Sequence, residues 1–432
     1  MKILHQLYLP VLFVLMLVLA GHRIKHNPRS VIWSDSEGYY LYLPGLFIIG
    51  DVHRIPVSSL WPQYNARGEQ FIKYTCGVAL FEAPFFLVTQ AYCQAKNYDW
   101  KDYFNIHYCR AMAICGCFFG FVGLFFLRQA LLRQFSRQVA FWTVMAVFFG
   151  TNLFHYTTRE MSVSHVYSFC LFSFVAWQTP RFLQHLSFKN AALLGGALGW
   201  IVLIRPTAVL VSLFVLLYDV YSWQELKSRV ALLARHVPQL ALAAATAFLF
   251  FVPQMLYWHS MTGHWLLYSY TDEHFIYWNR PKIADVLFDV QNGLFLYSPM
   301  VLLMVSGIIW GLKARKHHAP ALLLVFCLAT WIFASWWAWW FGGAFGHRCY
   351  VEYYALFAFP LAGVFEKIWT LKNAFLRRAV LAGMVFLMYY SVKMSFLYNV
   401  LPGPWDGPDW RWNPDKILWV WSHLFRWGAL GH

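Results

Sequence analysis

The chain has 432 residues, of which 60% are hydrophobic and only 12% charged, whereas roughly 25% of residues are charged in soluble domains. Aromatic residues make up 20% of the sequence, as in polytopic membrane proteins whose rings gather at both membrane interfaces. The composition argues against a water-soluble fold. It also excludes disordered, collagenous, coiled-coil and secreted disulfide-scaffold proteins.

The net charge of +15 comes from 34 Lys and Arg against 19 Asp and Glu. Such an excess can mark a nucleic-acid surface, but in a polytopic protein it indicates basic cytoplasmic loops and contact with membrane lipids. We therefore expect no nucleic-acid partner. The eight cysteines are scattered, mostly in apolar runs, a pattern typical of neither a metal cluster nor a disulfide framework. A disulfide such as Cys76 to Cys93 is the weaker alternative.

An apolar run at 3–20 is interpreted as a first membrane span, with a signal peptide as the alternative. Many further apolar runs follow, with no soluble domain between them. They lie at 77–95, 106–127, 138–154, 163–179, 190–204, 206–221, 237–257, 294–312, 319–341, 352–366 and 377–397.

The run at 77–95 decides the orientation of every later loop. If it lies in the outer interface, most loop Lys and Arg residues fall on the inside, as the positive-inside rule requires. Glu82, Pro84 and Gln90 also suit a half-buried juxtamembrane helix. The sequence thus predicts an all-α polytopic membrane protein of about eleven spans (range ~10–12). We expect one membrane domain over 1–400 and an outer tail over 401–432 that contains an interfacial helix.

Two carboxylates, Asp35 and Glu37, follow the first span at once, on the predicted outer face. Such a pair can provide a general base or hold a divalent cation. Ser34 and Glu37 also have the spacing of a capping box, in which Glu37 would only close a helix N-terminus. Asp35 is therefore the better candidate base.

The order of the motifs resembles the GT-C superfamily of membrane glycosyltransferases. Within it, the likeness is to the bacterial branch related to protein mannosyltransferases and the lipid A aminoarabinose transferase. The resemblance rests on the acidic residue after the first span, the long first outer loop and several short segments. These segments are Lys73-Tyr74-Thr75-Cys76-Gly77 with Ala83-Pro84-Phe85-Phe86, Gly150-Thr151-Asn152 with Met161-Ser162-Val163-Ser164-His165, Ile204-Arg205-Pro206-Thr207 and Gly342-Gly343-Ala344-Phe345-Gly346-His347-Arg348.

The resemblance implies a GT-C-like fold with juxtamembrane helices in the first outer loop, and an inverting glycosyltransferase of the bacterial cytoplasmic membrane with its site facing the periplasm. The donor would be a sugar on a polyprenyl phosphate, and the acceptor a lipid, a glycan or a protein. Asp35 would be the base, with Glu37 as a second acid. The expected donor or phosphate ligands are Lys73, Arg159, Arg205, His347 and Arg348, and the expected lining residues are Tyr39, Tyr40, Tyr74, Glu160 and His165.

Several alternatives stay open. Lys73 can simply snorkel at the interface, and Arg159 with Glu160 can be only a loop ion pair. The second outer loop departs from the pattern of relatives that carry an acidic residue near its end. No metal ligand is therefore assigned, no cofactor is certain, and a divalent cation stays an open question. The rival functions are a ligase or polymerase that uses a polyprenyl diphosphate, a lipid or sugar flippase, and a noncatalytic scaffold.

Overall fold

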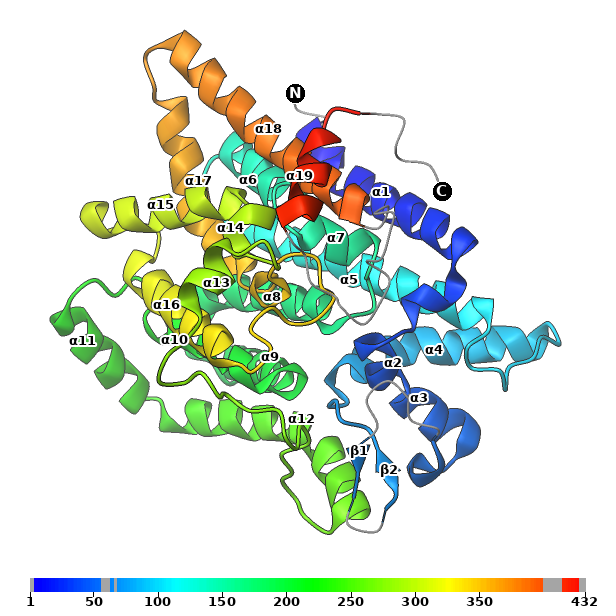
Figure 1. Ribbon diagram of the computed structural model, residues 1–432. Helices are drawn as coiled ribbons and strands as arrows, with labels where there is room; N and C mark the ends of the chain where they lie inside the picture. The colour runs from blue at the N-terminus through cyan, green and yellow to red at the C-terminus, as the bar shows by residue number, and fades with distance from the viewer. Residues whose placement is uncertain (1–3, 56–62, 66–67, 399–413, 427–432) are drawn as a thin grey trace.

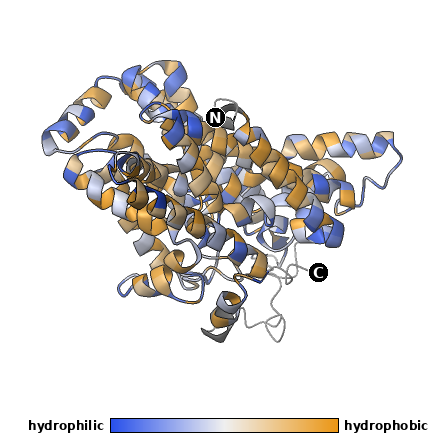
Figure 2. Ribbon diagram, turned by 90° about the horizontal axis from the view of Figure 1, so that it is seen from above, coloured by the Kyte–Doolittle hydropathy of each residue, from blue (hydrophilic) through white to orange (hydrophobic). Residues whose placement is uncertain are grey.

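The computed structural model describes residues 4–55, 63–65, 68–398 and 414–426. Helices pack around one extended hydrophobic core, so the predicted all-α class is confirmed (Figure 1). Four helices are long and apolar enough to cross a membrane, and five shorter apolar helices accompany them. Hydrophobic residues cover the long helices, while hydrophilic residues gather at their connections (Figure 2). The chain is a multi-pass membrane protein, and the number of spans stays a prediction.

The four long apolar helices are α1 (Leu4–His26), α5 (Ile106–Leu131), α12 (Val237–Thr262) and α18 (Ala374–Tyr398). The other helices of eight residues or more are α4 (Gly77–Ala95), α6 (Arg137–Phe149), α8 (Ser164–Gln184), α9 (Phe188–Ile204), α11 (Trp223–Ala234), α15 (Met300–Ala314), α16 (Ala319–Ser335), α17 (Tyr354–Trp369) and α19 (Pro414–Ser422).

The short elements belong mostly to the segments between these helices. They are η1 (Pro28–Val31), α2 (Asp35–Tyr40), α3 (Tyr42–Pro44), η2 (Gly45–Ile49), η3 (Val52–Arg54), α7 (Leu153–Thr158), η4 (Pro206–Leu210), α10 (Val211–Leu216), α13 (Ile283–Phe288), α14 (Leu294–Tyr297) and η5 (Arg348–Tyr350). Strands β1 (Gln63–Tyr64) and β2 (Gln70–Phe71) pair antiparallel, with Gln63 opposite Phe71 and Tyr64 opposite Gln70.

One predicted span is shorter than its apolar run. The run at 206–221 forms η4 and α10, which end at Leu216. Eleven helical residues rise only about 16 Å, far less than the roughly 30 Å of hydrocarbon in a bilayer. Pro206 lacks a backbone N–H, and Arg205 before it is extended at φ −147°, so the helix breaks between α9 and η4. The separate runs at 190–204 and 206–221 predicted this break, but hydropathy did not predict that the second helix ends at Leu216.

The α4 helix coincides with the decisive run at 77–95 and lies along one end of the bundle. Its first residue, Gly77, accepts a hydrogen bond of 2.8 Å from the indole N–H of Trp200 near the end of α9. Near its other end, Tyr92 packs on His107 at the start of α5, with ring centroids 5.6 Å apart. Between these contacts Phe81 packs on Phe119 in the middle of α5, with ring centroids 4.5 Å apart, so α4 runs alongside the first half of α5. The juxtamembrane position of α4 stays a prediction.

Small residues bring α9 and α12 into close contact. Gly195 and Gly199 lie one turn apart on α9, and a Cβ at either position would meet the α12 backbone, 2.4 Å from Ala247 at Gly199. This small-xxx-small spacing is typical of membrane helices whose backbones approach closely. The contact matters for the site, because the last part of α12 supports the loop that follows β2.

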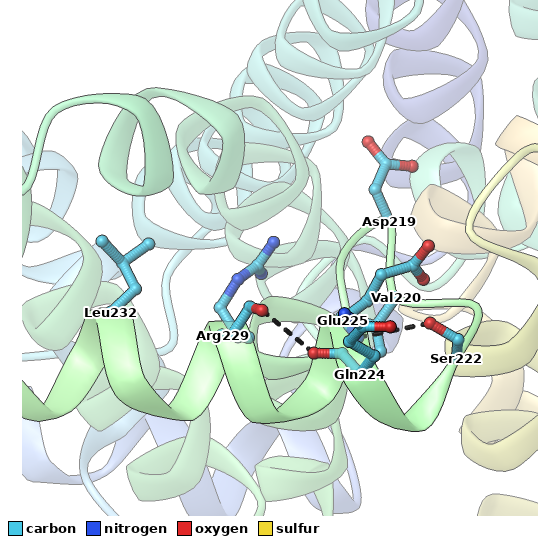
Figure 3. A pocket seen from close by; sticks show the side chains of 8 residues that line it. Asp219, Val220, Ser222, Gln224, Glu225, Arg229 and Leu232 are labelled. Atoms are coloured by element: carbon cyan, nitrogen blue, oxygen red, sulfur yellow. Dashed lines mark hydrogen bonds between the residues drawn. The ribbon is translucent and has the colours of Figure 1, made fainter.

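The molecule has two distinct ends along α12, which is about 39 Å long. At the start of α12, turns from separate segments meet: Gln134 donates a 2.9 Å hydrogen bond to Tyr218, and Asp219 pairs with His318 at 2.8 Å. A pocket of about 560 Å³ opens here beside α11 (Figure 3). At the other end, Gln254 and Tyr257 of α12 contact the first long loop. We call this second end, where Asp35 lies, the Asp35 face.

Candidate active site

Asp35 opens the short helix α2 at a strained turn. Ser34, the residue before the helix, has φ 56° and ψ −126°, a conformation that favours glycine. The Ser34 side chain makes no capping hydrogen bond, so the predicted capping box with Glu37 is not formed. The backbone N–H of Glu37 bonds instead to the Ser34 carbonyl at 3.1 Å. The turn places the Asp35 carboxylate at the start of α2 rather than along its side.

Two side chains contact the Asp35 carboxylate directly. Arg348 Nη1 lies 2.7 Å from Oδ2, and the Tyr74 hydroxyl donates a 2.6 Å hydrogen bond to Oδ1. Burial alone would raise the pKa of Asp35, but Arg348 and the bond from Tyr74 outweigh it. The charges of Arg205 and Lys73 act in the same direction, so the pKa of Asp35 lies below its usual value. Asp35 is an ionised carboxylate at neutral pH.

Arg348 is positioned by a turn that glycine makes possible. Phe341 has φ 56°, followed by Gly342 at 73° and Gly346 at 63°. At Gly346 a Cβ would meet Tyr297 at 2.8 Å, so only glycine fits this left-handed, crowded position. Burial of Arg348 is offset by Asp35, and its pKa stays above the usual value. Its Nε is buried and has no hydrogen-bond partner among the described residues.

Arg205 approaches from the break between α9 and η4. Its Nη1 lies 3.3 Å from Glu352 Oε1 and 3.4 Å from His165 Nδ1 at the start of α8. His165 Nδ1 is also 3.1 Å from the other Glu352 oxygen. Burial raises the pKa of Glu352 to about 7, against the opposing effect of Arg205. Arg205 is thus held by a carboxylate whose charge changes near neutral pH.

Lys73 comes from the loop between β2 and α4. Its ammonium pairs with Glu273 and lies 4.6 Å from the centroid of the Tyr270 ring. The Ser269 hydroxyl donates a 2.6 Å hydrogen bond to the Lys73 carbonyl, so the segment after α12 lies directly against this loop. The predicted interfacial snorkelling of Lys73 does not occur, because the side chain is only 7% exposed and faces protein groups.

Two predicted lining residues, Tyr39 and Tyr40, and one predicted donor ligand, His347, differ in their positions. Tyr39 packs on Tyr74 with ring centroids 4.8 Å apart and donates a 3.3 Å hydrogen bond to Ser164. Tyr40 instead points to the Tyr103 carbonyl, at 2.6 Å, on the other side of α2. The prediction for Tyr40 therefore has no support from its contacts. His347 is buried at the turn beside Arg348 and bonds to the Trp339 carbonyl at 3.1 Å.

The structure leaves three other predicted residues outside the Asp35 contacts. Glu37 faces Arg29, whose Nη2 is 3.6 Å away. Glu160 lies 3.4 Å from His155 Nε2, and its charge also acts on Arg159, although no direct Arg159–Glu160 ion pair forms among the described residues. Arg159 stacks on Phe396 with its guanidinium carbon 4.6 Å from the ring centroid. Lys73, Tyr74, Arg205 and Arg348, by contrast, all act on Asp35.

The sequence suggested Glu273 only as a residue of a segment, 268–278, that could line the acceptor side, and it did not reveal which acidic residues pair with the cations. Glu352 stands at the start of an apolar run, where a carboxylate is costly unless it is paired or functional. The energetic cost of an unpaired carboxylate in an apolar run was the sequence feature that could have identified Glu352 as a site residue. Glu273 and the neighbouring Tyr270 lie in the segment after α12, where no spacing distinguishes them. Only the tertiary structure brings them to Lys73.

A divalent cation does not fit the residues as they lie. Among the described residues, no group of three or more Asp, Glu, His or Cys side chains gathers in a way that could hold a metal ion. Asp35 faces an arginine and a tyrosine hydroxyl, and Glu160 faces His155. Cys76 and Cys93 lie near opposite ends of α4, and all eight cysteines are free.

Comparison with solved structures identifies the fold. No protein-family model matches the chain, and no curated protein matches it in sequence. The structure of ArnT from Cupriavidus metallidurans bound to undecaprenyl phosphate superposes with a TM-score of 0.53 at 17% identity, over 91% of this chain and 70% of that one. The apo oligosaccharyltransferase of Archaeoglobus fulgidus gives 0.50 at 12% identity, over 97% of this chain and 60% of that one. The chain has the GT-C fold.

The GT-C fold agrees with the resemblance seen in the motifs. The chain spans less than two thirds of the archaeal enzyme, and its identity to both structures is low. The likeness therefore extends to the fold, and the activity must be argued from the Asp35 group itself.

Proposed function

We propose that the protein is an inverting glycosyltransferase that moves a sugar from a polyprenyl phosphate to an acceptor hydroxyl on the outer face of the bacterial cytoplasmic membrane. The observation that carries this proposal is one ionised carboxylate, Asp35, surrounded by Arg348, Arg205 and Lys73. A base next to several phosphate-binding cations is what such a transfer requires. The likeness to ArnT bound to undecaprenyl phosphate supports the choice of donor.

In the proposed reaction, Asp35 accepts the proton of the acceptor hydroxyl as its oxygen attacks the anomeric carbon. The bond between that carbon and the phosphate oxygen breaks, and the polyprenyl phosphate leaves with the electron pair. Arginine is well suited to the negative charge on the leaving phosphate. The buried, unpartnered Nε of Arg348 is one donor for it, and Arg205 and Lys73 supply further positive charge.

The donor phosphate and Asp35 compete for Arg348 in this mechanism. The 2.7 Å ion pair occupies one carboxylate oxygen, and Tyr74 occupies the other. A phosphate that draws Arg348 away frees an oxygen of Asp35 for the hydroxyl proton. Donor binding would therefore prepare the base, and productive binding would be ordered with the donor first.

The test compares two neighbouring acidic residues in purified enzyme. Asp35→Asn should fold normally and lose sugar transfer from a defined polyprenyl-phosphate sugar, because the amide accepts no proton. Glu37→Gln is the matched control: Glu37 faces Arg29, so the variant should retain transfer. A parallel assay with a polyprenyl-diphosphate donor distinguishes a ligase or polymerase. Full turnover by Asp35→Asn would remove Asp35 from the mechanism.

A further inference from the structure

The segment Gly342–Arg348, which we call the Arg348 turn, has no regular secondary structure before η5, so its backbone groups need partners from elsewhere. At Phe345, three residues before Arg348, both backbone groups bond to side chains. The Phe345 N–H donates a 3.1 Å hydrogen bond to the Tyr156 hydroxyl, and the Phe345 carbonyl accepts one of 3.1 Å from the Asn152 amide. The Tyr156 hydroxyl also donates to this carbonyl, at 3.4 Å. Asn152 and Tyr156 thus hold the turn on both sides of the Phe345 Cα.

Asn152 directly precedes α7, a position where asparagine usually caps the helix with its own side chain. Here the side chain makes no capping hydrogen bond. Its nitrogen faces the Phe345 carbonyl, and its oxygen accepts a 2.8 Å hydrogen bond from the Tyr354 hydroxyl. Because a carbonyl cannot donate, these two partners fix the orientation of the amide. The fully buried Asn152 side chain therefore serves the Arg348 turn rather than its own helix.

Tyr156 lies four residues after Asn152, a spacing that puts both side chains on one face of the α7 segment. Tyr156 is also fully buried. A Cβ at Gly346 would lie 3.3 Å from the Asn152 amide nitrogen and 2.8 Å from Tyr297, so the turn approaches this segment closely. The α7 helix itself packs against α1 and α18 (Figure 1). Asn152 and Tyr156 therefore tie the Arg348 turn to the helix bundle.

Small shifts of the Arg348 turn matter because Arg348 meets Asp35 in one close contact. Its Nη1 lies 2.7 Å from Asp35 Oδ2, and a charge-assisted hydrogen bond of this length needs accurate alignment. Loss of the Tyr156 hydroxyl or of the Asn152 amide deprives a buried backbone group of Phe345 of a partner, and the backbone is expected to shift in response. A displacement of about 1 Å can cost about a hundredfold in rate. The place of Arg348 in the site thus depends on bonds made three residues away.

We propose that Asn152 and Tyr156 are positioning residues for Arg348: by holding the Phe345 backbone, they keep the guanidinium within reach of both Asp35 and the donor phosphate. The catalytic part of this role rests on the proposed glycosyl transfer. The position of Arg348 at Asp35 does not, and it can be tested without turnover. The Gly150-Thr151-Asn152 motif, which has no part in the proposed reaction, thereby gains a role.

The first experiment titrates the Asp35 carboxyl by infrared difference spectroscopy of the full-length protein in phosphatidylcholine nanodiscs. The band that disappears in Asp35→Asn identifies this carboxyl. Because Arg348 holds the pKa of Asp35 down, a displaced Arg348 should raise the proton affinity of Asp35 about tenfold in Tyr156→Phe and in Asn152→Ala. Tyr156→Phe removes one oxygen atom and keeps the ring packing, so it decides the question if Asn152→Ala fails to fold. A wild-type titration in the folded variants would overturn the proposal.

Two matched controls lose the same kinds of hydrogen bond away from the Asp35 face. The Tyr221 hydroxyl accepts a 3.0 Å bond from the backbone N–H of His318, so Tyr221→Phe matches Tyr156→Phe. The Asn190 amide donates a 2.8 Å bond to the His185 carbonyl, so Asn190→Ala matches Asn152→Ala. Asn190 lies near the start of α9, at the opposite end of this helix from Arg205. Both controls should leave the Asp35 titration unchanged, and an equal rise in them would show a general effect of lost stability and overturn the proposal.

Kinetics then test whether the two residues act through Arg348. In the otherwise wild-type enzyme, Tyr156→Phe should lower kcat/KM for the donor about tenfold. In Arg348→Gln the same change should have no further effect, because the group that it displaces is already absent. An equal loss in both backgrounds would make the effect independent of Arg348 and overturn the proposal. A wild-type enzyme that transfers no sugar would defeat the proposed function, while the infrared titration would still decide whether Asn152 and Tyr156 position Arg348.

Discussion

Replacing Arg348 with glutamine tests the central ion pair of the site. The change removes the cation that lies 2.7 Å from Asp35. Two unit charges about 4 Å apart attract each other by about 4 kcal/mol at an effective dielectric constant of 20. Each of the two side chains is 19% exposed, so water screens part of this attraction. The variant also avoids the desolvation cost of burying the Arg348 charge. The free energy of unfolding should therefore fall by about 1–3 kcal/mol.

The same change alters the protonation of the base. Without Arg348, burial dominates and the pKa of Asp35 rises. Because only the ionised carboxylate accepts the hydroxyl proton, kcat/KM at acidic pH should fall, and the acidic limb of the pH–rate profile should move to higher pH. In the wild type, the ionised Asp35 stabilises the folded state at pH values above the pKa of the unfolded chain, about 3.9. This stabilisation is lost as the pH falls through the lower pKa that Asp35 has in the folded state.

The assay measures sugar transfer from pH 5 to 9 and unfolding in parallel on the same preparation. Arg29→Gln is the matched control, because it removes an arginine that pairs with a different carboxylate, Glu37, at 3.6 Å. This control should leave the acidic limb where it is. An unshifted acidic limb in Arg348→Gln, with the protein folded, would show that the ion pair does not set the protonation state of Asp35.

Three other changes probe the surroundings of the base. Tyr74→Phe removes a 2.6 Å hydrogen bond to Asp35; we expect kcat to fall about tenfold and the acidic limb to move up, and an unchanged profile would contradict this. Glu352→Gln removes the counter-ion of Arg205. Because the pKa of Glu352 is about 7, the donor KM should fall at pH 8 and stay unchanged at pH 6, whereas equal effects at both pH values would refute the explanation. Gly199→Val places a side chain against the α12 backbone, and should lower the unfolding free energy by about 1–3 kcal/mol, which chemical denaturation would show.

The sequence predicted that Asp35 and several cations would lie on one face, because membrane proteins restrict where charge can lie. In a chain with 12% charged residues, an arginine between apolar runs, such as Arg205, needs a partner or a function. Order along the chain then suggested that Arg205, Arg348 and Asp35 share one face. They gather because all three lie in segments that connect apolar runs on the same predicted face. The all-α class followed from the same apolar runs.

Pairing between side chains could not be predicted in the same way. Glu352 and Glu273 are separated by 147 and 200 residues from the cations that they hold, and no periodicity relates such positions. Arg159 was expected at the donor, yet it stacks on Phe396, because α7 packs against α18 as well as α1. The early end of the helix after Arg205 could not be predicted either, because an apolar run reports composition and not where a helix ends.

The pattern of charge pairing determines how a phosphate-bearing donor would bind in the proposed reaction. Arg348, Arg205 and Lys73 each have a carboxylate partner in the ligand-free site. In the proposed reaction, a donor phosphate would therefore exchange partners with these carboxylates rather than fill an open cationic pocket. The exchange lowers the net gain in affinity, but it makes the release of Asp35 conditional on the donor.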